Sequence, residues 1–103
     1  MSEPTIGQNE TTIVLDTPIT RGNQTITQVV IRKPAAGELR GIRIQSLLEM
    51  DVESVMTALT RVTIPTLSKP ELMQTDPADF LQLGMGLITF LLPKSIQANF
   101  QQS

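Results

Sequence analysis

The stretch that most constrains the fold runs from Asp76 to Leu92 and has the sequence DPADFLQLGMGLITFLL. Asp76 is a good N-cap because its carboxylate can accept a hydrogen bond from a free backbone N–H of the first helical turn. Pro77 suits the first helical position, where its missing N–H costs nothing, and Pro93 cannot continue a helix. The sequence therefore predicts a C-terminal helix over residues 77–92.

Apolar side chains cover a wider arc of this helix than the stripe that a surface helix usually buries against its domain. At about 100° per residue, one side carries Phe80, Leu83, Leu87, Ile88 and Leu91. We expect the helix to be divided, with Phe80, Leu83, Leu87 and Leu91 facing the core and the edge with Leu81, Met85 and Leu92 left for a partner or a second copy. The residues that we expect to contact a partner are Leu81, Met85, Ile88, Leu92 and, from the helix predicted over 51–62, Met56.

Two glycines, Gly84 and Gly86, lie inside the same predicted helix. Each costs about 1 kcal/mol of helix propensity relative to alanine. This cost indicates that a neighbouring element approaches closely or that the helix must be malleable.

The preceding chain predicts a β-hairpin. Two segments rich in β-branched residues, about 12–17 and 25–32, flank the turn residues Arg21-Gly22-Asn23. Pro18 would have to lie at a sheet edge or a strand end. Both faces of the second strand carry apolar residues, so its alternation leaves the choice of buried face open.

Short helices are predicted between the hairpin and the last helix, at about residues 35–40, 51–62 and 69–74. Asp51 is the expected N-cap of the second, and Ser68 with Glu71 matches a capping box for the third. Inward-facing apolar residues of the 51–62 helix recur at helical spacing: Val52, Val55, Met56, Leu59 and Val62.

The expected organisation is a single small α+β domain over residues 11–94, with a flexible arm at 1–10 and a flexible tail at 95–103. A chain of 103 residues has room for one modest core. The N-terminal ten residues lack the basic start and apolar run of a signal peptide, and the longest apolar stretch is too short for a membrane span.

Composition excludes several kinds of chemistry. The chain has no His, Cys, Trp or Tyr, which removes the commonest general base, the thiol nucleophile and the usual soft-metal ligands. We predict no catalytic, cofactor-binding or metal-binding residue and no small-molecule substrate. A net charge of -2 gives no reason to expect nucleic acid, and the cations at Arg32, Lys33, Arg40 and Arg43 are better explained as a solvated surface.

Three segments resemble a known family: LDTPITRGNQTITQVVIRKPAAGELRGI, LLEMDVESVMTALTRVT and LSKPELMQTDPADFLQLG. Together they cover most of residues 15–92, and RKPAAGELRG and DPADFLQLG are their most telling parts. The chain resembles the phage tail assembly chaperones of the E type, from contractile-tailed, Mu-like phages. None of these pieces is a catalytic motif, so the likeness is one of overall pattern.

The resemblance implies a chaperone of the host cytoplasm that binds the tape measure protein, keeps it soluble, promotes assembly of tail tube subunits around it and leaves before the virion is complete. The expected partners are the tape measure protein and the tail tube protein, and a homo-oligomer stays open. It also implies that a longer product can arise by ribosomal frameshifting, which the amino-acid sequence does not test. The alternative function is a structural minor tail protein or another small interaction module.

Overall fold

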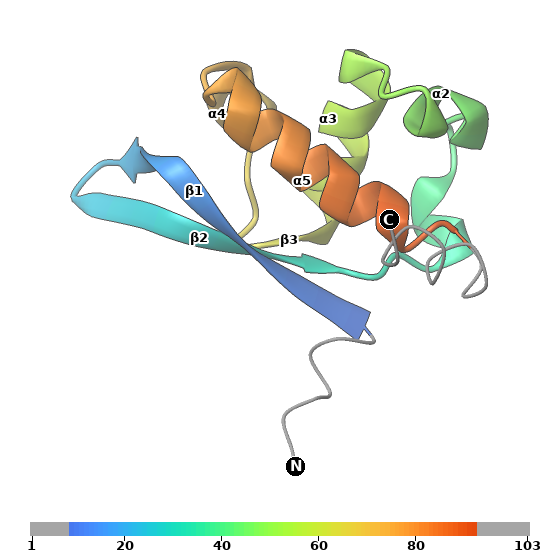
Figure 1. The fold of residues 1–103 in the computed structure, drawn as a ribbon, viewed down its shortest axis with the longest axis horizontal. Helices are drawn as coiled ribbons and strands as arrows, with labels where there is room; N and C mark the ends of the chain where they lie inside the picture. Colours follow the sequence, from blue (N-terminus) through green and yellow to red (C-terminus); the bar gives the residue numbers. More distant parts are fainter. Residues whose placement is uncertain (1–8, 93–103) are drawn as a thin grey trace, which may run out of the picture.

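A hairpin and a set of short helices make up the fold, which the structure, a computed structural model, describes over residues 9–92. Figure 1 shows the helices gathered on one side of the sheet, which confirms the predicted α+β class. Residues 1–8 of the predicted arm and the whole predicted tail lie outside the described residues. In chain order, the elements are β1 (Glu10–Arg21), β2 (Gln24–Arg32), the 3-10 helix η1 (Ala36–Leu39), α2 (Ile44–Leu48), α3 (Val52–Val62), β3 (Thr63–Ile64), α4 (Lys69–Met73) and α5 (Pro77–Thr89).

The hairpin is longer than predicted, because β1 continues past Pro18 to Arg21. The antiparallel pairing is interrupted between Val14 and Ile19, so four residues of β1 bulge out opposite a single residue, Thr27, of β2. Pro18 lies in this bulge, where no ladder hydrogen bond is required of it. Pro18 was expected at a sheet edge or a strand end, and its position in β1, an edge strand of the sheet, confirms the first of these.

The bulge also decides which face of β2 is buried. Ile26 is buried, and so are Val29 and Ile31, although an unbroken strand would place residues 26 and 29 on opposite faces. Between the pairs Ile13–Val29 and Ile19–Ile26, β1 advances six residues (19 − 13) and β2 advances three (29 − 26). The strand therefore changes its buried face at the bulge, and both faces contribute to the core.

The sheet has a third strand that the sequence did not indicate. Thr63 and Ile64 directly follow the helix predicted over 51–62, and they form β3, which pairs with Ile31 and Val30 of β2. Two residues are too few to show strand periodicity. The pairing places α3 directly before a sheet strand, so the helix is held against β2.

The N-terminal caps are confirmed. The carboxylates of Asp51 and Asp76 accept hydrogen bonds from the backbone N–H groups of Ser54 and Ala78, at 3.0 and 2.8 Å. Ser68 forms the predicted capping box with Glu71. The predicted helix over 35–40 is a short 3-10 helix, and α5 ends at Thr89 rather than at residue 92. Residues 90–92 continue as turns whose N–H groups bond to the carbonyl three residues back.

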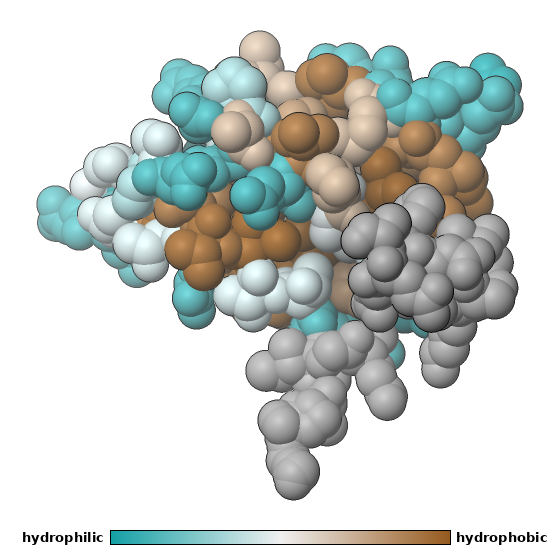
Figure 2. Space-filling model, viewed as in Figure 1, coloured by the Kyte–Doolittle hydropathy of each residue, from teal (hydrophilic) through white to brown (hydrophobic). Residues whose placement is uncertain are grey.

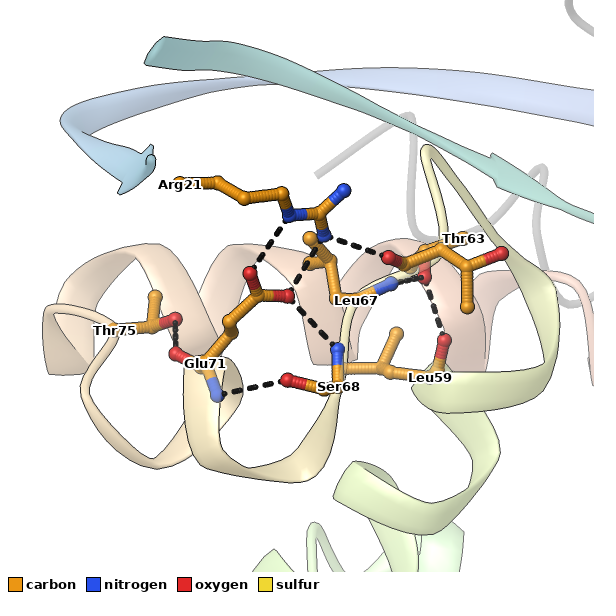
Figure 3. Close-up of polar contacts among 8 residues, drawn as sticks. Arg21, Leu59, Thr63, Leu67, Ser68, Glu71 and Thr75 are labelled. Atoms are coloured by element: carbon orange, nitrogen blue, oxygen red, sulfur yellow. Dashed lines mark hydrogen bonds and ion pairs between the residues drawn. The ribbon is translucent and has the colours of Figure 1, made fainter. Parts of the chain in front are cut away.

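Glu71 also joins the hairpin to the helices (Figure 3). Its carboxylate accepts two hydrogen bonds from the guanidinium of Arg21, at 2.8 and 2.7 Å, and one from the Ser68 N–H. Arg21 donates further to the Thr66 carbonyl. Hydrogen bonding to Arg21 lowers the pKa of Glu71 from 4.5 to about 2. The end of the hairpin is thus attached to the start of α4.

The core lies between the sheet and the helices, with α5 along it (Figure 1). As predicted, Leu83 and Leu87 of α5 are fully buried, and Phe80 and Leu91 pack against the core. The buried apolar residues are Leu15, Ile26, Val29, Ile31, Leu39, Leu47, Val55, Met56, Ala58, Leu59, Val62, Leu67, Leu72, Leu83 and Leu87.

Asp79 has a larger role than the sequence suggested. Asp79 lies in the first turn of α5, where negative charge is favourable, but its side chain is 1% exposed. Its two carboxylate oxygens accept hydrogen bonds from the backbone N–H groups of Asp16 and Thr17, at 2.8 and 2.9 Å. Both donors lie in the bulge of β1, outside the regular pairing with β2. A carboxylate from α5 therefore fixes the bulge and sets α5 on the sheet.

Candidate functional site

The predicted partner edge of α5 is open to solvent along part of its length. Leu81 is 49% exposed and Met85 is 57% exposed. Ile88 and Leu92, which were predicted to join them, are half-buried. Leu81, Met85 and Ile88 recur at helical spacing and so share one side of α5. Partner binding by these four residues stays a prediction.

Met56 was also predicted to contact a partner, but it belongs to the core. Its side chain is only 8% exposed, and its neighbours on α3, Val55 and Leu59, are fully buried. The helical spacing of these three residues already placed Met56 on the inward stripe. We therefore leave it out of the candidate surface.

Two exposed apolar residues flank Met50 in the chain, and the Met50 side chain lies against α5 at Gly84. Leu48 ends α2 and Val52 begins α3, and both are about half exposed. Figure 2 shows apolar side chains gathered over α5 and toward α2. We call the set Leu48, Val52, Leu81, Met85 and Ile88 the apolar strip.

Met50 and Gly84 join the α2–α3 corner to α5. A Cβ atom at Gly84 would lie 2.7 Å from Met50 Cε and 3.4 Å from Val55 Cγ1. The glycine therefore makes room for the Met50 side chain, which confirms that α5 has a closely approaching neighbour. Gly86 serves a similar contact on the sheet side, where a Cβ would lie 3.2 Å from Ile31 Cδ1.

Met50 occupies a backbone conformation that usually belongs to glycine, with φ of 60°. It follows α2, where the N–H groups of Met50 and Asp51 donate to the carbonyls of Leu47 and Ser46 at 2.9 Å each. This pattern is a Schellman motif, whose left-handed position is normally Gly. The left-handed conformation costs about 1–2 kcal/mol for a residue with a Cβ. A long flexible side chain is thus kept against Gly84 of α5 at a conformational cost.

Of the four cations of the basic junction, Arg32 is engaged in structural contacts. Arg32 forms a bidentate ion pair with Glu38, at 2.9 and 2.7 Å, which lowers the pKa of Glu38 from 4.5 to about 2. Arg61 donates to the carbonyls of Glu38 and Arg40. Arg40 and Arg43 are exposed. These contacts join η1 to α3 and agree with the expected solvated surface.

Two clefts in the described part of the chain have linings that are explained by the fold. One, of about 380 Å³, follows the free edge of β2 beside Pro65 and has no titratable group. The other, of about 260 Å³, contains Glu71 and Asp76, which bind Arg21 and cap α5. Within residues 9–92, no three acidic side chains come together as a metal site. None of the described helices combines the length and apolarity needed to cross a membrane.

Comparison with known proteins gives this surface a context. A family model described as phage tail assembly chaperone proteins, E, or 41 or 14, matches residues 12–92. The chain belongs to this family. The resemblance found in the sequence is thus confirmed, and the family is one of assembly chaperones rather than a known class of enzyme.

Two relatives of this tail assembly chaperone come from Escherichia phage P2. The chain is 36% identical over 88 residues to tail assembly protein E, an alignment that covers 85% of the chain and 97% of that protein. It is 35% identical over 83 residues to tail assembly protein E′, which covers 81% of the chain but 58% of E′. The chain therefore spans less than two thirds of the longer relative. No solved structure matches the chain.

Proposed function

We propose that this tail assembly chaperone binds helical segments of the tape measure protein along the apolar strip and so keeps that protein soluble. In the same proposal it acts in the host cytoplasm, promotes assembly of tail tube subunits around the tape measure protein and is absent from the finished virion. The observation that carries the proposal is the pair Leu81 and Met85, large apolar side chains about half exposed on one side of α5.

The arrangement of the strip supports a helical partner. Apolar residues on one side of α5 and at the α2–α3 corner can receive the apolar face of an amphipathic helix. Methionine suits such a surface because its unbranched, polarizable side chain adapts to partners of different shape. Clusters of exposed apolar side chains on small proteins commonly mark protein–protein contacts.

Co-expression with the tape measure protein tests the proposal. Leu81→Asp and Met85→Asp place a carboxylate in the proposed contact, where burial without a partner costs several kcal/mol. We expect each variant to bind at least about tenfold more weakly and to lose the ability to keep the tape measure protein in the soluble fraction. Both positions are exposed, so the free energy of unfolding should change by less than about 1 kcal/mol.

Val14→Asp is the matched control. Val14 is 67% exposed and neighbours Ile13, whose side chain lies against α5 at Gly86, so Val14 points away from the helices. This variant should solubilise the tape measure protein like the unmodified chain. If the two α5 variants are folded and still solubilise it, the proposed surface is wrong. Mass spectrometry of purified virions separately tests the proposed absence of the chaperone from the particle.

A further inference from the structure

Acidic side chains border the apolar strip where α2 is followed by α3. Glu49, Asp51 and Glu53 are each adjacent in the sequence to Leu48 or Val52, and all three are exposed. Lys69 forms an ion pair with Glu53 at 2.9 Å. Within the described residues, no Lys or Arg forms an ion pair with Glu49 or Asp51, so this border keeps a net negative charge.

The other side of the strip adds no positive charge to offset this border. α5 contains no Lys or Arg, and its single charged residue, Asp79, is buried and bonded to β1. The nearest arginine on α3 is Arg61, nine residues after Val52 and about 14 Å farther along the helix axis. Arg61 contacts η1 there and does not reach the strip.

We propose that the apolar strip selects amphipathic helical segments that carry Lys or Arg beside their apolar stripe. The basic flank of the bound helix lies against Glu49 and Asp51, while its apolar stripe covers Leu81 and Met85. The inference rests on the proposed function and deepens it by naming the chemistry of the segment that is bound. Charge complementarity at the rim of an apolar contact fixes orientation and disfavours wrong partners.

Two synthetic peptides test this inference without the tape measure protein. Both are helical peptides of about 18 residues, long enough to form a helix, with the same leucine stripe and one tryptophan. One carries Lys at the flanking positions and the other Glu. The chain has no Trp or Tyr, so tryptophan fluorescence reports the peptide alone. Affinity is measured at low and high salt.

We expect the Lys peptide to bind about threefold to tenfold more tightly than the Glu peptide at low salt, with the ratio falling toward one at high salt. Glu49→Gln should weaken binding of the Lys peptide by about twofold to fivefold. Asp51 is not substituted because it caps α3. Asp16→Asn is the matched control, since it removes the same charge from the exposed bulge of β1.

The outcomes separate this inference from the proposed function. If Leu81→Asp weakens both peptides but the two bind equally well, the charge preference is wrong and the docking surface stands. The same conclusion follows if Asp16→Asn weakens binding as much as Glu49→Gln, because the effect then comes from net charge. If Leu81→Asp changes neither affinity, the docking surface itself is wrong.

Discussion

The contact between Asp79 and the bulge of β1 makes a strong prediction about stability. Asp79→Ala removes two hydrogen bonds of 2.8 and 2.9 Å from a carboxylate that is 1% exposed. Hydrogen bonds to a charged group contribute about 1.5–3 kcal/mol each. Asp16 and Thr17 are exposed residues, so water can reach part of the freed backbone, and we take the lower part of the range. The free energy of unfolding should fall by about 3–4 kcal/mol.

Urea denaturation followed by circular dichroism measures this loss, because the chain has no Trp or Tyr to report unfolding by fluorescence. For a domain of this size the melting temperature should fall by about 12–32 °C. Asp79→Asn keeps one acceptor oxygen and should lose about half as much. Asp16→Asn, which leaves the backbone donor in place, should change stability by less than about 0.5 kcal/mol. A loss below about 1 kcal/mol for Asp79→Ala would refute the assigned role of this carboxylate.

Two further perturbations test the contacts around α4 and α5. The pKa of Glu71 is lowered to about 2, so its contribution to stability is fully present above pH 4.5 and is lost as the pH falls toward 2. Glu71→Gln can still form the capping box, and it should make the free energy of unfolding depend less steeply on pH in this range. An unchanged dependence would contradict the ion pair with Arg21. Gly84→Ala should gain more stability in the Met50→Gly background, up to about 1 kcal/mol, because the end of the Met50 side chain then need not shift away from the new Cβ. Equal effects in both backgrounds would show that the two residues are not coupled.

Local chemistry explains which parts of this fold were predictable. Caps such as Asp51, Ser68 and Asp76 depend on residues within one helical turn, so their hydrogen bonds could be inferred from short stretches of sequence. The helical periodicity of α5 indicated which of its apolar residues face the core and which lie on the other edge. Gly84 could be assigned to a close contact from its propensity cost, although the sequence did not identify Met50 as the neighbour.

The parts that were missed depend on contacts between distant segments. In the bulge of β1, the N–H groups of Asp16 and Thr17 donate to Asp79, more than sixty residues later in the chain. Asp79 already had a sufficient local explanation as a charge in the first helical turn, so no signal pointed to a second role. β3 is too short for a periodic signal. Val52 was expected on the inward stripe, but the first turn of α3 extends beyond the core and leaves it exposed.

The most direct test of the central claim is site-specific photo-crosslinking during co-expression with the tape measure protein. A photoreactive residue at Met85 should crosslink to apolar segments of the tape measure protein, and one at Val14 on the opposite side of the domain should not. Mass spectrometry of the crosslinked peptides identifies the bound segments. Crosslinks from Val14 with none from Met85 would contradict the claim that the exposed side of α5 is the docking surface.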